Sequence, residues 1–446
     1  MQFHSTFALS MITCLGLIAC GDDSDAVDEA SGTPSSGVSS SSSGSGASSA
    51  GGGGQGGAGA QGGAGPGVGG SAGGGGTAGA GGSSPCHGEP GAADKDRFVV
   101  VGHPYDAESN PAQDYEVLSL SSAGDLATTG THFTMGRPAD STIVFTPDGA
   151  LGFAVQDDGS IGAFAIDAAG AVTVLQSEYN PGFYATSLTM SADGTQLYVV
   201  DPNFPNNGGG VYRVGIACDG SLTDEGRLLE SKSAQALLPL PGGDSLLAAR
   251  GALGSVGVAH AHRITLDPPA LVQSVDVFGD DDAILSWATL THDGKFALLG
   301  DNSAFSGVPN RVGVVEVTAG GLATTQVLSD IEDPYAIAAS PFDDAALVVS
   351  GFGDALWVLD YDAAASEPFS VRGEVEYVGG SPQLPGSLAM VERGALEGRV
   401  LIADIRGVFV VDFQPGAVVE DLGITTLGDG IGDGIEDIVV GIGVQP

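Results

Sequence analysis

Carboxylates stand at the ends of several short apolar runs in this chain. Asp201 ends VVD, Asp301 ends LGD, Asp404 ends IAD, and Asp157 has a similar place. Connecting segments add the acids of FGDDDA, DIEDP and GDGIGDG. If the runs are equivalent strands, these oxygens line one face and favour Ca²⁺, which takes about 6 to 8 oxygen ligands, or a cationic partner. The alternative is that Asp forms turns in a chain that is acidic everywhere.

Two histidines, His260 and His262, lie two residues apart in VAHAHRITL. On a strand this spacing places both imidazoles on one face, as a pair of metal ligands or catalytic groups requires. Ile264 and Leu266 would share that face, which favours packing instead. The sequence offers no identifiable third ligand. It also lacks the G-x-S-x-G, H-E-x-x-H and C-x-x-C motifs.

The tail GDGIGDGIEDIVVGIG resembles a calcium loop at first sight. A loop of the EF-hand type beginning at Asp429 would need an oxygen ligand at Ile431 and a glutamate at Val440, so that motif fails. The apolar run Gly434 to Ile442 is better explained as a strand. The first repeat, near Phe98, lacks an inner strand, and we expect the tail to supply it and close the fold.

The elements that would position these residues form a repeat. Turns recur about every 49 residues, at Asp148-Gly149, Asp193-Gly194, Gly242-Gly243, Asp293-Gly294, Asp343-Asp344 and Arg393-Gly394. Asp-Gly between apolar runs is a strong hairpin signal. Repeats of this length hold four short strands and leave no room for crossover helices. They therefore predict an all-β, seven-bladed β-propeller over residues 96–446.

The runs FTPDGALGFAV, MSADGTQLYVV and THDGKFALLG resemble the repeat unit of lactonase-like, YVTN-type propellers. The resemblance implies a propeller fold with a ligand site at the channel mouth. Some members of that family are 6-phosphogluconolactonases and many others bind or scaffold. No catalytic residue of the family matches a position in this sequence.

Composition narrows the possible partners. The chain has 446 residues with 55 acidic and 14 basic side chains, for a formal net charge of −41. Such a chain repels nucleic-acid phosphates and anionic lipid head groups, and it suits cations or cationic partners. We therefore expect no nucleic-acid binding.

The N-terminus carries a candidate export signal. Phe7 to Ala19 is mostly apolar and ends in LIA, followed by Cys20. This resembles a bacterial lipoprotein lipobox, which implies cleavage of residues 1–19 and lipidation of Cys20, although the segment before it contains neither Lys nor Arg. Gly21 rather than Asp after the cysteine favours the outer membrane or cell surface. An ordinary signal peptide, or a buried apolar segment with a chance cysteine, is the alternative.

Residues 20–95 are predicted to be a linker. Gly, Ser and Ala dominate residues 31 to 85, which cannot bury a core and are expected to be disordered. A flexible chain of ~65 residues has a root-mean-square reach of about 45 Å, which suits a membrane tether. Cys86 and Cys218 are the remaining cysteines after Cys20 in the mature chain. In an oxidising compartment they would form one disulfide; the alternative is two separate thiols.

The sequence therefore predicts a lipid-anchored, monomeric, extracytoplasmic propeller that binds an unidentified protein or small molecule, with calcium as a possible cofactor. The alternative function is a lactonase-like hydrolase. An enzyme should bring His103, Arg250 or Arg406 together with Asp201, Asp301 and Asp404 at the channel mouth. An acidic mouth without such a cluster favours binding.

Overall fold

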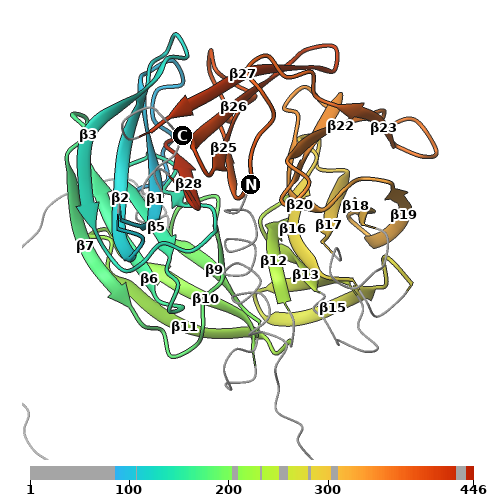
Figure 1. Cartoon of the computed structure of the whole chain (residues 1–446). Helices are drawn as coiled ribbons and strands as arrows, with labels where there is room; N and C mark the ends of the chain where they lie inside the picture. Colours follow the sequence, from blue (N-terminus) through green and yellow to red (C-terminus); the bar gives the residue numbers. More distant parts are fainter. Residues whose placement is uncertain are drawn as a thin grey trace, which may run out of the picture. The chain divides into compact units, whose positions relative to one another are not determined.

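Each pair of apolar runs flanking a predicted turn forms two adjacent antiparallel strands. This computed structural model describes residues 86–446 except 107, 203–208, 232–233, 251–259, 280–282, 303–309 and 428–437. Within these ranges the strands build seven four-stranded sheets (Figure 1). The predicted all-β, seven-bladed β-propeller is confirmed. Cys20, the signal segment and the linker up to residue 85 lie outside the described residues.

The blades are numbered here in chain order, each from its inner to its outer strand. Blade 1 contains β28 (Gly441–Val444), β1 (Arg97–Tyr105), β2 (Pro111–Leu120) and β3 (Leu126–Thr134). Blade 2 contains β4 (Val144–Phe145), β5 (Leu151–Val155), β6 (Ile161–Ile166) and β7 (Val172–Tyr179). Blade 3 contains β8 (Ser187–Met190), β9 (Gln196–Asp201), β10 (Gly210–Ile216) and β11 (Leu222–Leu229). Blade 4 contains β12 (Ala234–Pro239), β13 (Ser245–Arg250), β14 (Ala261–Leu266) and β15 (Pro269–Val275).

The remaining three blades follow the same plan. Blade 5 contains β16 (Leu285–Leu290), β17 (Phe296–Asp301), β18 (Arg311–Thr318) and β19 (Gly321–Ser329). Blade 6 contains β20 (Pro334–Ala339), β21 (Ala345–Ser350), β22 (Ala355–Tyr361) and β23 (Phe369–Glu374). Blade 7 contains β24 (Leu388–Met390), β25 (Arg399–Asp404), β26 (Gly407–Gln414) and β27 (Val418–Thr426). Inner strands touch in the order β28, β4, β8, β12, β16, β20, β24 and back to β28, which closes the ring.

The predicted turns join the inner strand of a blade to its second strand. In blade 2 the Gly149 amide donates to Thr146 O (2.7 Å), and Gly149 has a φ of 74°, which glycine adopts without steric cost. Blades 3 and 5 repeat this turn at Gly194 and Gly294. All these turns lie on one face of the ring, which we call the turn face. The opposite face, where inner strands begin and second strands end, is the mouth face.

The C-terminal strand completes blade 1, as predicted. Strand β28 pairs with β1 from Val99–Val444 to Gly102–Gly441. The strand begins at Gly441 rather than at the predicted residue 434, and residues 428–437, with Asp429 and Asp433, lie outside the described residues. A Cβ at Gly443 would lie 2.2 Å from Ile143 O, so only glycine lets β28 approach blade 2 so closely.

Apolar side chains between neighbouring blades form the core. One cluster joins Val99 and Leu118 of blade 1 to Leu401 and Val408 of blade 7. Second strands are buried on both faces, so β25 is fully buried, whereas outer strands such as β7 alternate between partly buried and exposed residues. Nowhere in the described part of the chain is there a helix with the length and apolar character needed to cross a membrane.

Candidate functional site

Two of the four predicted calcium ligands are buried carboxylates held by arginines. The Asp301 carboxylate is fully buried at the end of β17, where Oδ2 accepts from Arg311 Nε (2.9 Å) and Nη2 (2.7 Å). Asp404 is equally buried at the end of β25 and accepts from Arg406 Nε (2.9 Å). In both cases a carboxylate oxygen also receives a backbone N–H from the segment that precedes the inner strand, Ile284 in blade 5 and Gln383 in blade 7.

The other two aspartates also have protein partners. Asp201 is fully buried at the end of β9 and receives the Tyr184 N–H (3.4 Å), and Asp157 pairs with Arg137 Nη1 (2.7 Å). Among the described residues, no three His, Cys, Asp or Glu side chains form a group that could hold a metal ion. Asp157, Asp201, Asp301 and Asp404 therefore do not gather into the predicted calcium site. Each holds together its own blade or the loop beside it.

The two histidines of blade 4 have separate polar partners. His260 is 1% exposed, and its Nδ1 lies 2.9 Å from Asp276 Oδ1. His262 Nδ1 lies 2.8 Å from Ser274 Oγ, and its Nε2 lies 3.5 Å from Arg250 Nη1. Burial, with the nearby Arg250 charge, lowers the pKa of His262 to about 4, so that ring is neutral at physiological pH. Both imidazoles thus lie in the packed blade, as Ile264 beside them does.

The described residues do not assemble the cluster of histidine, arginine and aspartate that an enzyme site at the channel mouth would need. His103 lies in blade 1, with Nδ1 3.2 Å from Ile438 O and Nε2 3.5 Å from Glu116 Oε2. Arg250 stays beside His262 in blade 4, and Arg406 stays on Asp404 in blade 7. Each candidate acid–base or cationic group therefore has a partner within its own blade.

A different set of residues meets inside the ring. Tyr335 OH donates to Asp140 Oδ2 (2.7 Å), and the Ser387 N–H donates to Asp140 Oδ1 (3.0 Å). Asp140 precedes the inner strand of blade 2, Tyr335 lies in that of blade 6, and Ser387 precedes that of blade 7. Blades 2 and 6 are not neighbours, so the bond from Tyr335 to Asp140 must span the central channel. We call Asp140, Tyr335 and Ser387 the channel bridge.

Beside the channel bridge lies a buried carboxyl group, that of Asp333. Asp333 immediately precedes β20 and is 2% exposed. Its Oδ2 accepts a hydrogen bond from the Phe352 N–H (2.5 Å). Oδ1 is buried and has no hydrogen-bond partner in the described structure, and the same holds for Ser350 Oγ. Asp333 Oδ2 and the Tyr335 ring flank the same backbone position, because a Cβ on Gly351 would lie 3.3 Å from the former and 3.2 Å from Tyr335 Cγ.

The electrostatics of this corner reflect burial among like charges. Burial and the neighbouring Glu332 raise the pKa of Asp333 to about 6, against the Phe352 hydrogen bond, which lowers it. Burial likewise raises the pKa of Asp140 despite its hydrogen bonds to Tyr335 and Ser387. The pKa of Tyr335 is raised well above its usual value by burial and by the Asp140 and Asp333 charges. A cationic group placed here would relieve these interactions.

Sequence reasoning reached only part of this corner. Asp333 lies in the segment DIEDP, which the sequence marks as acidic, but Asp140 and Tyr335 were not singled out. Their contact joins residues 195 positions apart in the sequence, and no other described blade repeats it. A signal does exist in retrospect: both residues stand where an inner strand begins, at the mouth face.

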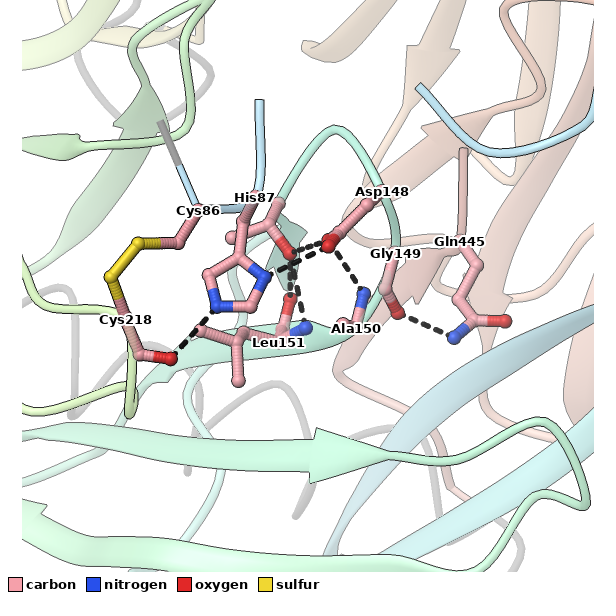
Figure 2. Close-up of polar contacts among 9 residues, drawn as sticks. Cys86, His87, Asp148, Gly149, Ala150, Leu151, Cys218 and Gln445 are labelled. Atoms are coloured by element: carbon pink, nitrogen blue, oxygen red, sulfur yellow. Dashed lines mark hydrogen bonds and ion pairs between the residues drawn. A yellow bond between two sulfur atoms is a disulfide. The ribbon is translucent and has the colours of Figure 1, made fainter. Parts of the chain in front are cut away.

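The turn face carries the N-terminal end of the described chain. Cys86 and Cys218 form a disulfide, with Cα atoms 5.4 Å apart and 132 residues between them in sequence (Figure 2). Cys218 lies in the turn between β10 and β11 of blade 3. The following residues, 87–96, lie along the turn face and reach blade 7, where Asp94 Oδ1 receives the Ala395 N–H (2.8 Å). We call residues 86–96 the strap.

His87 connects the strap to two blades. Its Nδ1 lies 2.8 Å from Asp148 Oδ2, and its Nε2 lies 2.9 Å from Cys218 O, as Figure 2 shows. Both neighbours are acceptors, so both ring nitrogens must carry protons to satisfy them. Burial alone would lower the pKa of His87, but the bonds to Cys218 O and Asp148 outweigh that effect and raise it. The strap is thus joined to the ring by a disulfide and an imidazolium.

Comparisons with known proteins agree with the fold. No family model matches the chain, and no curated protein matches it by sequence. Among solved structures, a putative 6-phosphogluconolactonase from Bacteroides fragilis is 16% identical, with a TM-score of 0.58 over 80% of this chain and 99% of that one. The periplasmic gluconolactonase of Pseudomonas aeruginosa is 18% identical, with a TM-score of 0.55 over 75% of this chain and 96% of that one. A hypothetical selenium-binding protein from Sulfolobus tokodaii is 10% identical, with a TM-score of 0.57 over 76% and 93% of the two chains. At these identities the likeness establishes that the chain is a seven-bladed β-propeller whose structural neighbours include lactonase-like proteins.

Proposed function

We propose that this protein is an extracytoplasmic, membrane-anchored binding propeller whose ligand site lies on the mouth face at blade 6. The observation that carries the proposal is Asp333 Oδ1, a buried acceptor with no partner among the described residues. Leaving a buried polar group unsatisfied costs about 1–3 kcal/mol. A ligand that donates to this oxygen would recover that cost.

The channel bridge supports the same location. Because Tyr335 and Ser387 both donate to Asp140, the bridge spans the channel beside Asp333 and provides a fixed polar surface. Binding is favoured over catalysis because His103, Arg250 and Arg406, the groups that would accompany a catalytic carboxylate, are engaged in their own blades. A thermal-shift screen of small polar molecules, run on wild type and Asp333→Asn, tests this proposal. Ligands that raise the melting temperature of wild type but not of the variant would support it, and identical responses would contradict it.

The anchoring part of the proposal rests on the lipobox-like sequence at Cys20 and the Gly/Ser-rich tract that follows it. Several acyl chains bind a membrane far more firmly than one, at about 0.8 kcal/mol per buried CH₂. We expect Cys20→Ala to move the protein from the membrane fraction to the soluble fraction. Cys218→Ser, which leaves Cys20 in place, is the control and should stay with the membrane. Tight membrane association of Cys20→Ala would contradict the lipid anchor.

The second candidate function is hydrolysis of a sugar lactone at the same corner. It is favoured by the buried Asp333 Oδ1, which has no partner among the described residues, and by burial of this carboxyl, which raises its pKa to about 6 and suits a general base near neutral pH. Asp333 would take a proton from water as the water oxygen attacks the lactone carbonyl; the ring C–O bond would break and its oxygen would gain a proton. The acidic surroundings repel phosphate, so an uncharged gluconolactone fits better than its 6-phosphate. Titration of the acid released from glucono-1,5-lactone, above the spontaneous rate and with Asp333→Asn as comparison, separates this function from binding.

A further inference from the structure

We infer that the blade 6 corner binds an organic cation, an ammonium or guanidinium group, through Asp333. This inference rests on the proposed binding function and names the chemical class of its ligand. Equivalent positions differ between the blades of the ring. The difference concerns Asp333, Ser350 and Ala355 of blade 6, all of which are described.

Blades 5 and 7 show what a buried carboxylate on the mouth face requires. In blade 5 the last residue of the second strand, Asp301, pairs in register with Arg311, the first residue of the third strand, and the two form a buried ion pair. In blade 7 the second strand ends at Asp404, and Arg406 in the turn that follows supplies the counter-charge. In these two blades the buried carboxylate thus has a guanidinium within the same blade, which offsets the cost of burying its charge.

Blade 6 has a buried carboxylate on the mouth face but no arginine at the position of Arg311. Its second strand ends at Ser350, which pairs in register with Ala355, so Ser and Ala stand where blade 5 has Asp and Arg. The carboxylate comes instead from Asp333, at the start of the inner strand. Residues 330–361, all described, contain neither Arg nor Lys. Arg372, on the outer strand of the blade, pairs with Asp360, so blade 6 offers no cation to Asp333 among its described contacts.

The surrounding groups fit a cation with N–H donors. Glu332 is exposed next to Asp333, and Tyr335 and Asp140 lie on the channel side, so the titratable groups around Asp333 that the structure describes are acidic. Ser350 Oγ, fully buried and without a described partner, adds a second acceptor at the same turn, close to Glu332 around Gly353. The described residues do not offer three metal ligands here, whereas a guanidinium or ammonium can be held by one carboxylate and neighbouring oxygens.

The test uses two probes of nearly the same size and shape, one cationic and one neutral. Nα-acetyl-argininamide and its uncharged analogue Nα-acetyl-citrullinamide are titrated calorimetrically into the full chain at 0.15 M salt, where unspecific attraction to the acidic surface is largely screened. We expect the arginine probe to bind at least tenfold more tightly than the citrulline probe. Equal affinities, or no binding of the arginine probe, would overturn the inference. Agmatine, in a parallel titration, distinguishes a free guanidinium ligand from one carried on a peptide.

Variants then assign the site. Asp333→Asn removes the charge but keeps an oxygen for the Phe352 N–H, and asparagine tolerates the φ of 44° found there, so the fold should be retained. We expect Asp333→Asn to lower the affinity for the arginine probe at least tenfold. Glu178→Gln, on the exposed face of β7, removes the same charge elsewhere and should leave the affinity unchanged. Equal effects of the two variants would overturn the site and indicate unspecific attraction.

The pH dependence supplies an independent readout. Because Asp333 must be ionised to hold a cation, affinity should fall about tenfold per pH unit below pH 6 and level off above it. A flat profile between pH 4.5 and 7 would contradict the role of Asp333. If no cation binds but other ligands still depend on Asp333, the binding function stands and this inference fails. If glucono-1,5-lactone is hydrolysed in an Asp333-dependent way, the proposed binding function itself fails.

Discussion

At the scale of single residues, the same side chain has different roles depending on its partner. Asp301 and Asp404 are buried acids with arginines and serve the architecture of their blades. Asp333 is a buried acid with a free oxygen among the described contacts, and it serves as the candidate site. The sequence places all three next to strand ends, but it does not reveal which acid has a counter-ion, because that depends on register between strands.

The buried Asp301–Arg311 ion pair should contribute strongly to the stability of the folded protein. Arg311→Met keeps an apolar stem against the Phe278 ring, which lies 4.7 Å from the guanidinium carbon, but removes the counter-charge of the buried Asp301 carboxylate. We expect a loss of about 3–5 kcal/mol in the free energy of unfolding, measured by urea denaturation. Arg372→Met, which breaks the exposed pair with Asp360, is the matched control and should cost about 0–1 kcal/mol. Equal losses would contradict the structural role given to Asp301.

His87 should make stability depend on pH in a defined window. Its raised pKa means that its contribution is complete below its ordinary value of about 6.5 and is lost as pH rises through the folded-state value. Asp148 is partly buried, which raises its pKa, but hydrogen bonds from Ala150, His87 and Thr146 outweigh this and lower it. The Asp148 contribution is therefore lost only as pH falls below about 4.

We therefore expect the difference in unfolding free energy between wild type and His87→Ala to be largest near pH 5–6 and to shrink toward pH 8.5. Denaturation at several pH values measures it. In an Asp148→Asn background the same substitution should show a weaker pH dependence. A difference that stays constant from pH 5.5 to 8.5 would contradict the imidazolium described at the strap.

At the scale of elements, the repeat was largely readable from the sequence. Turns such as Asp148-Gly149 and Asp193-Gly194 lie between strands that are local in the chain, so their signals are complete within about ten residues. The closing strand was also predictable, because the first blade visibly lacked an inner strand. The channel bridge was not, because Asp140 and Tyr335 meet only after the ring has closed.

Adding a single methyl group at Gly443 should destabilise the fold. A Cβ there would lie 2.2 Å from Ile143 O, so Gly443→Ala must push β28 away from blade 2. We expect a loss of about 1–3 kcal/mol, seen as a lower melting temperature. Gly379→Ala, where nothing lies within 4 Å of the added Cβ, is the control and should melt like wild type. An unchanged melting temperature for Gly443→Ala would mean that β28 does not fit as tightly as described.

At the scale of the whole molecule, strand β28 closes the ring and the disulfide closes a covalent loop within it. Strand β28 closes it by hydrogen bonding to β1, and the disulfide ties the strap to blade 3 across 132 residues. In the chain-entropy account, a cross-link closing a loop of this length stabilises the fold by about 4–5 kcal/mol. The two closures lie in different blades and should contribute separately.

The double variant Cys86→Ser/Cys218→Ser should therefore unfold at a lower urea concentration, by an amount on the order of 4 kcal/mol. The measurement is equilibrium denaturation with and without reductant. Reductant should lower the stability of wild type to that of the variant and leave the variant unaffected. Wild-type stability that does not respond to reductant would show that the disulfide contributes nothing to the fold.

The strap also determines how the protein carries mechanical load. A pull applied through the N-terminal chain reaches the propeller at Cys86 and passes through a covalent bond into the β10–β11 turn of blade 3. The seam between β1 and β28, which hydrogen bonds and apolar packing hold and which would otherwise be the first strand pair in line, is bypassed. A ligand held at blade 6 while the N-terminus is pulled would load the ring between blades 3 and 6. The seam that closes the ring thus lies outside the path of the force.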